Sequence, residues 1–209
     1  MAEAGISYEY REAAHEVSQS YLLEPIKELL KGVPSGAKVL DLGCGNGSFI
    51  SLFQDRGWKL YGSDFSPSGI EIARRTFPGI EFFLADASSP TGEILERVGL
   101  VDVIVSTEVI EHLYDPKGFF RNAHGLLKPG GILVLTTPYH GYLKNLMLAV
   151  TGQMDQHFTV LWDHGHIKFW SRKTLTEALQ EIGFGDFEFV GAGRVPYLWK
   201  SMIMRARKV

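Results

Sequence analysis

The sequence has little cysteine, little net charge and no long apolar run, and each shortage excludes a class of protein. Its single cysteine, Cys44, excludes an internal disulfide framework and fits a reducing compartment. No stretch approaches the roughly 18 apolar residues of a membrane span. The polar first residues, MAEAGISYEYREAAHE, also lack the apolar run of a signal peptide. These absences together predict a cytoplasmic protein.

The charge balance limits the possible partners. The formal net charge is -3 and the isoelectric point is about 6.2, so the chain has no global basic field to hold a nucleic-acid backbone. A small-molecule acceptor is therefore favoured over a nucleic acid. The length of 209 residues, with 45% hydrophobic content, suits one domain over residues 1–209 with room for a small inserted segment.

Short apolar runs of strand type alternate with helical patterns five times along the chain. This alternation is typical of an α/β protein in which helices cover both faces of a parallel sheet, a Rossmann-like doubly wound fold. The expected strands are 38–42, 59–64, 80–86, 101–106 and 131–137, and the expected helices are 48–57, 67–77, 91–99 and 116–130. A helix over 17–32 precedes them, and a helix over 174–184 and strands over 186–190 and 201–207 follow.

Three glycines follow the first expected strand in VLDLGCGNGSF, at Gly43, Gly45 and Gly47. In a doubly wound sheet, ligands bind beyond the carboxyl ends of the strands. Glycines at this turn allow the positive φ angles with which a backbone approaches a ligand closely. The dinucleotide fingerprint G-x-G-x-x-G requires a glycine where this chain has Ser48. The G-x-G-x-G spacing therefore counts against a nicotinamide-dependent dehydrogenase.

Carboxylates end three successive expected strands, at Asp41, Asp64 and Asp86. Asp41 lies before the glycines, where it would repel a pyrophosphate but suit a cationic amino group. Asp64, 21 residues after Gly43, is placed to accept hydrogen bonds from two ribose hydroxyls. Asp86, with Ala87, is placed to receive the amine of an adenine. Each aspartate alone is more often a helix cap or turn residue, but three at successive strand ends indicate a ligand site.

The motifs DLGCGNG, LADA, EVIEHLYDP and LLKPGGILVLTTP, together with Asp64, resemble the motif series of class I S-adenosylmethionine-dependent methyltransferases over residues 36–138. The resemblance implies a seven-stranded sheet whose last strand is antiparallel, with S-adenosylmethionine bound over its first two strands. The layout is similar to that of the ubiquinone-biosynthesis O-methyltransferases, which share EVIEH and a long insertion after the fifth strand. The cofactor-binding positions that the resemblance implies are Asp41, Gly43, Cys44, Gly45, Asp64, Phe65, Asp86, Ala87, Thr107 and Glu108.

TEVIEHLYDP places acidic and imidazole side chains where the resemblance implies that the transferred methyl group lies. If a helix begins near Glu108, Glu111 and His112 stand at i+3 and i+4 on the same face. Carboxylates with imidazoles suit Mg²⁺, Mn²⁺ or Zn²⁺, and His164 and His166 offer a further ligand. The candidate metal ligands are Glu108, Glu111, His112 and His166. The alternative is that the glutamates favour the helix dipole and His112 packs against the cofactor loop, with no metal involved.

The histidine-rich stretch LWDHGHIKFWS favours an oxygen acceptor. A phenol, whose pKa is about 10, is mostly protonated at neutral pH, and either a metal or a histidine base removes that handicap. His166 is therefore the candidate base or metal ligand, and His164 is second. His140 and His157 are expected to be surface or packing histidines.

The predicted activity is O-methylation of a small phenolic or aromatic hydroxyl by S-adenosylmethionine. The sequence leaves open whether Mg²⁺ or another divalent metal assists the transfer. One alternative is N-methylation of a small amine, which needs less activation. Another is 2′-O-methylation of an RNA 3′ end, because the small-RNA methyltransferases place a similar Glu-x-x-Glu-His motif on a divalent ion. A non-enzymatic binding module is disfavoured, since a chain without a cofactor has no need of Gly43, Gly45, Asp64 and Asp86 together.

Residues 139–170 are the expected cap over the acceptor site, inserted after the fifth strand. Four apolar side chains recur in it at helical spacing: Leu143, Leu146, Met147 and Val150. They are expected to line an apolar acceptor pocket, or else to close the edge of the core. A further alternative is a helix that rests on a membrane surface, with Lys144 beside its apolar face. Residues 1–32 are the expected N-terminal helix and lid, with Tyr8 and Tyr10 over the cofactor.

Overall fold

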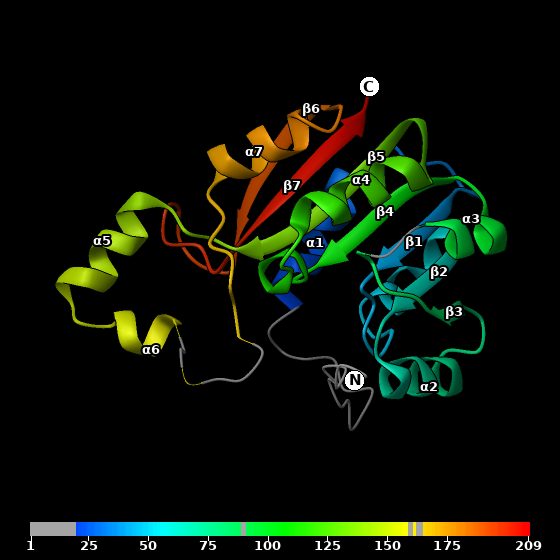
Figure 1. Cartoon of the computed structure of the whole chain (residues 1–209), viewed down its shortest axis with the longest axis horizontal. Coiled ribbons are helices and arrows are strands. Elements are labelled where there is room, and N and C mark those ends of the chain that lie inside the picture. Colours follow the sequence, from blue (N-terminus) through cyan, green and yellow to red (C-terminus); the bar gives the residue numbers. More distant parts are fainter. Residues whose placement is uncertain (1–19, 89–90, 159–160, 162–164) are drawn as a thin grey trace, which may run out of the picture.

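The computed structural model describes residues 20–88, 91–158, 161 and 165–209, and seven strands among them form one sheet (Figure 1). The strands are β1 Lys38–Leu42, β2 Lys59–Asp64, β3 Glu81–Leu84, β4 Val101–Thr107, β5 Leu127–Pro138, β6 Phe184–Ala192 and β7 Ser201–Lys208. Their order across the sheet is β3-β2-β1-β4-β5-β7-β6. Neighbouring strands from β3 to β5 are parallel, whereas β7 is antiparallel to both β5 and β6. The predicted Rossmann-like sheet with an antiparallel last strand is confirmed.

Helices cover both faces of the sheet. The helices of the described residues are α1 Ser20–Leu29, η2 Ile50–Arg56, α2 Pro67–Thr76, α3 Gly92–Val98, η3 Ile110–His112, α4 Pro116–Leu126, α5 Tyr142–Val150, α6 Met154–Phe158 and α7 Arg172–Gln180. Side chains alternate along each strand, so in β4 Val103 and Val105 join one core and Ile104 joins the other. The helices α1, η2 and α2 pack on the first core, and α3, α4 and α7 pack on the second. None of these helices is both long and apolar enough to span a membrane.

The helix that was expected to begin near Glu108 does not form there. The backbone of Glu108 has a φ of 53°, in the left-handed region, and the short 3-10 turn η3 separates it from α4, which begins at Pro116. The cause is local, because Pro116 fits the first position of a helix and the Asp115 side chain caps that helix. Glu111 and His112 therefore share a 3-10 turn instead of one face of an α-helix.

The insertion after β5 carries α5 and α6 away from the sheet, beyond the ends of β4 and β5 (Figure 1). Its apolar side chains are exposed, so they do not close the edge of the core: Leu143, Leu146, Met147 and Val150. Lys144 is instead the buried residue of α5. Its ammonium donates a hydrogen bond to the Tyr139 carbonyl at 2.9 Å. Lys144 is therefore turned inward from the exposed apolar side chains of α5, and contact of this helix with a membrane stays a prediction.

The described part of the N-terminal segment belongs to the core. Helix α1 packs through Leu22 and Ile26, both fully buried, and the hydroxyl of Tyr21 lies 2.7 Å from Ser201 Oγ on β7. Tyr8 and Tyr10, the expected lid residues, lie outside the described residues. From Ser20 onward, the expected lid segment is thus a structural helix.

Candidate active site

The loop after β1 is fastened to the end of β2. The N–H groups of Gly43 and Cys44 donate to the Ser63 carbonyl at 2.8 and 2.9 Å, and the N–H of Gly45 donates to Asp64 Oδ2 at 2.8 Å. Gly43 and Gly45 have φ angles of 88° and 54°, which residues with a side chain rarely adopt. The loop therefore presents bare backbone at the carboxyl end of the sheet.

Replacing Gly43 by alanine is expected to lower both the melting temperature and the affinity for S-adenosylmethionine. A Cβ at this position of positive φ lies 2.7 Å from Cγ2 of Val109, so the loop must shift at a cost of roughly 1–3 kcal/mol. Gly92→Ala is the control, because a Cβ there meets nothing within 4 Å. Thermal unfolding and calorimetric titration with the cofactor measure the two effects. Equal melting temperatures for both variants contradict this role of Gly43.

Asp41 is a buried carboxylic acid beside this loop. It is 1% exposed, and neither of its carboxyl oxygens has a hydrogen-bond partner among the described residues. Burial, and then the charge of Asp64, raise the pKa of Asp41 from 3.8 to about 8. Buried polar groups are normally satisfied, so this carboxyl fits the cationic amino group of S-adenosylmethionine.

Asp64 and Asp86 lie at the end of β2 and just after β3, where ribose and adenine contacts are expected. One carboxylate oxygen of Asp64 accepts the Gly45 N–H and the other accepts the Ser66 N–H, both at 2.8 Å. These bonds fix the carboxylate and leave a lone pair on each oxygen for a ligand hydroxyl. Burial raises the pKa of Asp64, while the N–H groups oppose the rise. Asp86 is exposed and accepts the Ser88 N–H at 2.8 Å.

Three further expected cofactor positions, Phe65, Cys44 and Ala87, differ in whether the side chain or the backbone faces the cofactor loop. Phe65 is 49% exposed, whereas Cys44 is buried, and its sulfur lies 2.9 Å from where a Cβ would stand on Gly62. The Ala87 carbonyl accepts the side-chain N–H of Asn122 at 2.8 Å. The thiol of Cys44 therefore faces the core, and its backbone is the part that lies in the cofactor loop.

Glu108 follows Thr107, the buried last residue of β4. The Glu108 N–H donates to the Thr136 hydroxyl oxygen at 3.1 Å, and that hydroxyl donates to Glu108 Oε1 at 2.7 Å. Burial raises the pKa of Glu108, and the Thr136 hydroxyl opposes the rise. This reciprocal contact with β5 holds Glu108 in its left-handed backbone conformation.

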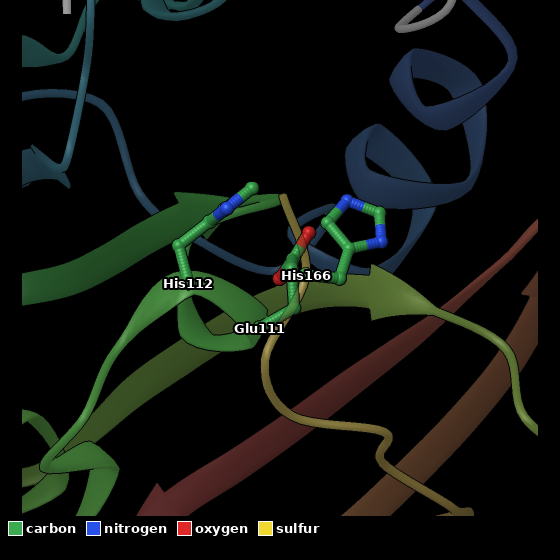
Figure 2. Close-up of side chains that lie close together, drawn as sticks. All are labelled: Glu111, His112 and His166. Carbon is green, nitrogen blue, oxygen red and sulfur yellow. The ribbon is translucent and has the colours of Figure 1, made fainter. Parts of the chain in front are cut away.

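Three of the four expected metal ligands converge close to Glu108: Glu111, His112 and His166 (Figure 2). One ligand atom of each lies within 4.8 Å of the others, and the two imidazole ring centroids are 4.9 Å apart. Figure 2 shows the Glu111 carboxylate between the two rings. Glu108 is not part of this group, and its carboxylate is engaged by Thr136 instead.

Backbone hydrogen bonds bring His166 to this turn. The carbonyl of Glu111 accepts the N–H groups of both Ile167 and Lys168, at 2.9 and 3.0 Å. The chain that returns from the cap is thereby fastened to η3 directly after His166. His164, the second candidate base, lies outside the described residues.

Burial changes the ionisation of this group. Glu111 is fully buried, and the hydroxyl of Thr137 is the side-chain hydrogen-bonding group beside its carboxyl. Burial, and then the charge of Glu108, raise the pKa of Glu111 well above its usual range. Burial, and then His112 and His157, lower the pKa of His166 to about 4. At neutral pH His166 is therefore neutral, in the form that binds a metal ion or accepts a proton.

Sequence reasoning missed three polar residues around Glu108, namely Thr136, Ser201 and Tyr21. The pKa of Tyr21 is raised by burial first, and the charges of Glu108 and Glu111 add to the rise. Two threonines that follow the apolar run ILVL near the end of β5 were an available signal for Thr136. Tyr21 lies on α1, far away in the sequence, and no motif connects it to this site.

Comparison with known proteins adds family information to this geometry. The methyltransferase domain family matches residues 11–187. A ubiquinone biosynthesis O-methyltransferase from Ruegeria pomeroyi is 27% identical over 172 residues, covering 81% of this chain and 68% of that protein. A ubiquinone biosynthesis O-methyltransferase from Pseudomonas aeruginosa is 36% identical over 160 residues, covering 71% of this chain and 68% of that protein.

Solved structures share the fold at lower identity. Magnesium protoporphyrin IX methyltransferase from Synechocystis PCC 6803, with bound S-adenosylmethionine, aligns with a TM-score of 0.65 at 16% identity, covering 90% of this chain and 78% of that one. An S-adenosylmethionine-dependent methyltransferase from Archaeoglobus fulgidus aligns with a TM-score of 0.66 at 18% identity, covering 90% of this chain and 93% of that one. The chain belongs to the methyltransferase domain family and is a class I S-adenosylmethionine-dependent methyltransferase.

Proposed function

We propose that this methyltransferase methylates a phenolic hydroxyl of a small aromatic acceptor with the help of a divalent metal ion. The observation that carries the proposal is the convergence of ligand atoms from Glu111, His112 and His166 within 4.8 Å of one another. The group lies beyond the end of β4, beside the expected cofactor site. The names of the relatives, ubiquinone biosynthesis O-methyltransferases, support an oxygen acceptor.

The three side chains fit a divalent metal ion. The Glu111 carboxyl is fully buried and lies close enough to Glu108 for the two charges to repel, and a buried carboxylate requires a cation or donors. His166 is neutral because its pKa is lowered to about 4, and neutral imidazoles with a carboxylate are a suitable ligand set for Mn²⁺, Zn²⁺ or Mg²⁺. When bound, such an ion lowers the pKa of a hydroxyl that contacts it.

The side chains of the protein align the acceptor with the methyl group of the cofactor. Methyl transfer from a sulfonium is an in-line displacement, so the acceptor oxygen must lie opposite the leaving sulfur. In the proposed arrangement Asp41 binds the amino group of the cofactor, Asp64 binds the ribose, and Asp86 binds the adenine. The neutral imidazole of His166 is the group that accepts the hydroxyl proton where a metal ion does not activate the acceptor.

The acceptor is proposed to bind between the metal ligands and the cap, residues 139–170. The rings of Phe158 and Phe169 lie 5.1 Å apart at this side of the molecule, and aromatic side chains are typical of small-molecule sites. The exposed apolar side chains of α5 support contact of the cap with a lipid surface that carries an apolar acceptor.

A screen of acceptors with and without EDTA tests the proposal. Catechols, phenols, amines and short RNA are each incubated with labelled S-adenosylmethionine, and the methylated product is identified by mass spectrometry. We expect a catechol to be methylated on oxygen, EDTA to stop the reaction, and Mg²⁺ or Mn²⁺ to restore it. Methylation of amines or RNA with the catechols inert overturns the proposed acceptor, and full activity in EDTA overturns the proposed metal. The net charge of -3 already counts against RNA.

A further inference from the structure

The loop after β3, which carries Asp86, is fastened to the rest of the protein on either side of that aspartate. Before it, the N–H of Ala85 donates to the Asp64 carbonyl at the end of β2, at 2.9 Å. After it, the Ala87 carbonyl accepts the side-chain N–H of Asn122 on α4, at 2.8 Å. Asp86 therefore lies between two anchors, and the second anchor is the side chain of one residue on a helix.

One peptide group connects Asn122 to the carboxylate of Asp86. It joins Ala87 to Ser88, and we term it the linking peptide. Its carbonyl accepts the side chain of Asn122, and its N–H donates to Asp86 Oδ1 at 2.8 Å. The group is planar and trans, so its C=O and N–H point in opposite directions. Asn122 therefore holds one end of a rigid unit whose other end holds the Asp86 carboxylate.

The carboxylate of Asp86 lies at the expected cofactor site. Burial raises the pKa of Asp64 first, and the charge of Asp86 adds to the rise, so the two carboxylates lie near the same edge of the sheet. Asp86 is exposed, and an exposed side chain loses conformational entropy when a ligand fixes it. The linking peptide restricts this carboxylate in advance. A carboxylate accepts about four hydrogen bonds, so Asp86 can still accept one from a ligand.

Helix α4 gives Asn122 a firm support. Its neighbours on the helix at i−3, i+1 and i+4 are fully buried in the core: Phe119, Ala123 and Leu126. Asn122 itself is half-buried at the edge of that face, and Ala87 packs against the same core. Asparagine is a weaker helix former than alanine, so the loop that it holds, and not the helix, explains an amide at this position.

We propose that Asn122 is a positioning residue for the cofactor, which through the linking peptide directs the Asp86 carboxylate at the amine of the adenine and so sets the preference for adenine. This inference rests on the contact between Asp86 and the adenine in the proposed function. The adenine amine donates a hydrogen bond, whereas hypoxanthine carries a carbonyl oxygen at the same place, which a carboxylate repels. A carboxylate with a fixed direction discriminates between the two bases, and a mobile one turns away from the carbonyl.

Two matched ligands test the proposal by calorimetric titration: S-adenosylhomocysteine, and S-inosylhomocysteine, which carries hypoxanthine in place of adenine. We expect the unmodified protein to bind the adenine ligand roughly 20-fold more tightly, since a hydrogen bond to a charged group gives discrimination of this order. Asn122→Ala should reduce this preference to about threefold or less and leave the affinity for S-inosylhomocysteine within about twofold. Gln180→Ala removes an exposed amide from α7, and as the control it should retain the preference.

Asp86→Ala shows whether Asn122 acts through Asp86. This variant should lose the preference by itself, and adding Asn122→Ala to it should change the remaining preference by less than about twofold. A merely structural asparagine would lower both affinities alike. That result, an unchanged preference in Asn122→Ala, or a further loss in the double variant overturns the positioning role. An unchanged preference in Asp86→Ala overturns the proposed adenine contact as well, whereas the proposed acceptor and metal are tested separately because no titration here contains them.

Discussion

Glu111→Gln is expected to lower kcat/KM for a catechol by at least about 100-fold, because a metal ion supplies several kcal/mol of charge stabilisation to such a reaction. Glutamine keeps the size of the side chain but cannot carry the negative charge that is proposed to hold a cation between His112 and His166. Steady-state methyl transfer measures the loss of turnover. Calorimetric titration with Mn²⁺ should show that the same substitution removes metal binding, which gives a readout independent of activity.

The loss is expected without unfolding. Glu111 is fully buried and has a raised pKa, so a neutral amide suits its surroundings at least as well as a carboxylate. Melting temperature and affinity for S-adenosylmethionine should therefore stay at or above those of the unmodified protein. Glu177→Gln, at an exposed glutamate 3.8 Å from Lys173, is the matched control. Turnover of Glu111→Gln equal to that of the control contradicts a catalytic role, and lost turnover with intact Mn²⁺ binding contradicts the metal role.

The sheet was predictable because the sequence of each strand shows the apolar pattern of a buried strand. Continuous apolar runs such as VDVIVS in β4 indicate strands buried on both faces, and glycines and capping residues mark where the runs end. The backbone at Glu108 was not predictable. Its φ of 53° accompanies hydrogen bonds to Thr136 on β5, and such contacts between strands distant in the sequence leave no trace in a local pattern.

The candidate site was predictable where it depends on the ends of strands, and not where it depends on contacts between distant segments. The strand-end rule placed Asp41 and Asp64 at one edge of the sheet, and the structure brings them close enough for their charges to interact. The meeting of His166 with Glu111 depends on two backbone hydrogen bonds to the Glu111 carbonyl, for which no residue type is diagnostic. Lys144 illustrates the limit for helices, because periodicity gives the spacing of side chains and not the face that turns inward.

Asp41→Asn is expected to weaken S-adenosylmethionine binding by roughly 100-fold, because removing one partner of a buried ion pair leaves the other uncompensated. Asp55→Asn, at an exposed aspartate of η2, is the control and should bind the cofactor normally. Calorimetric titration measures both affinities. Unchanged affinity in Asp41→Asn contradicts the assignment of Asp41 to the amino group of the cofactor.

The same substitution should stabilise the cofactor-free protein, with a pH dependence that follows from the pKa of Asp41. That pKa is 3.8 for an ordinary aspartate and about 8 in the folded protein, so between these values the folded state holds a proton that the unfolded state has lost. Stability therefore falls as pH rises through this window, by up to about 1.4 kcal/mol per pH unit. Asparagine does not titrate, so urea unfolding of Asp41→Asn should lack this slope, and its advantage should grow towards pH about 8. A structural aspartate would instead lose stability on the substitution, so a gain in stability together with a loss of binding identifies Asp41 as a residue kept for the cofactor.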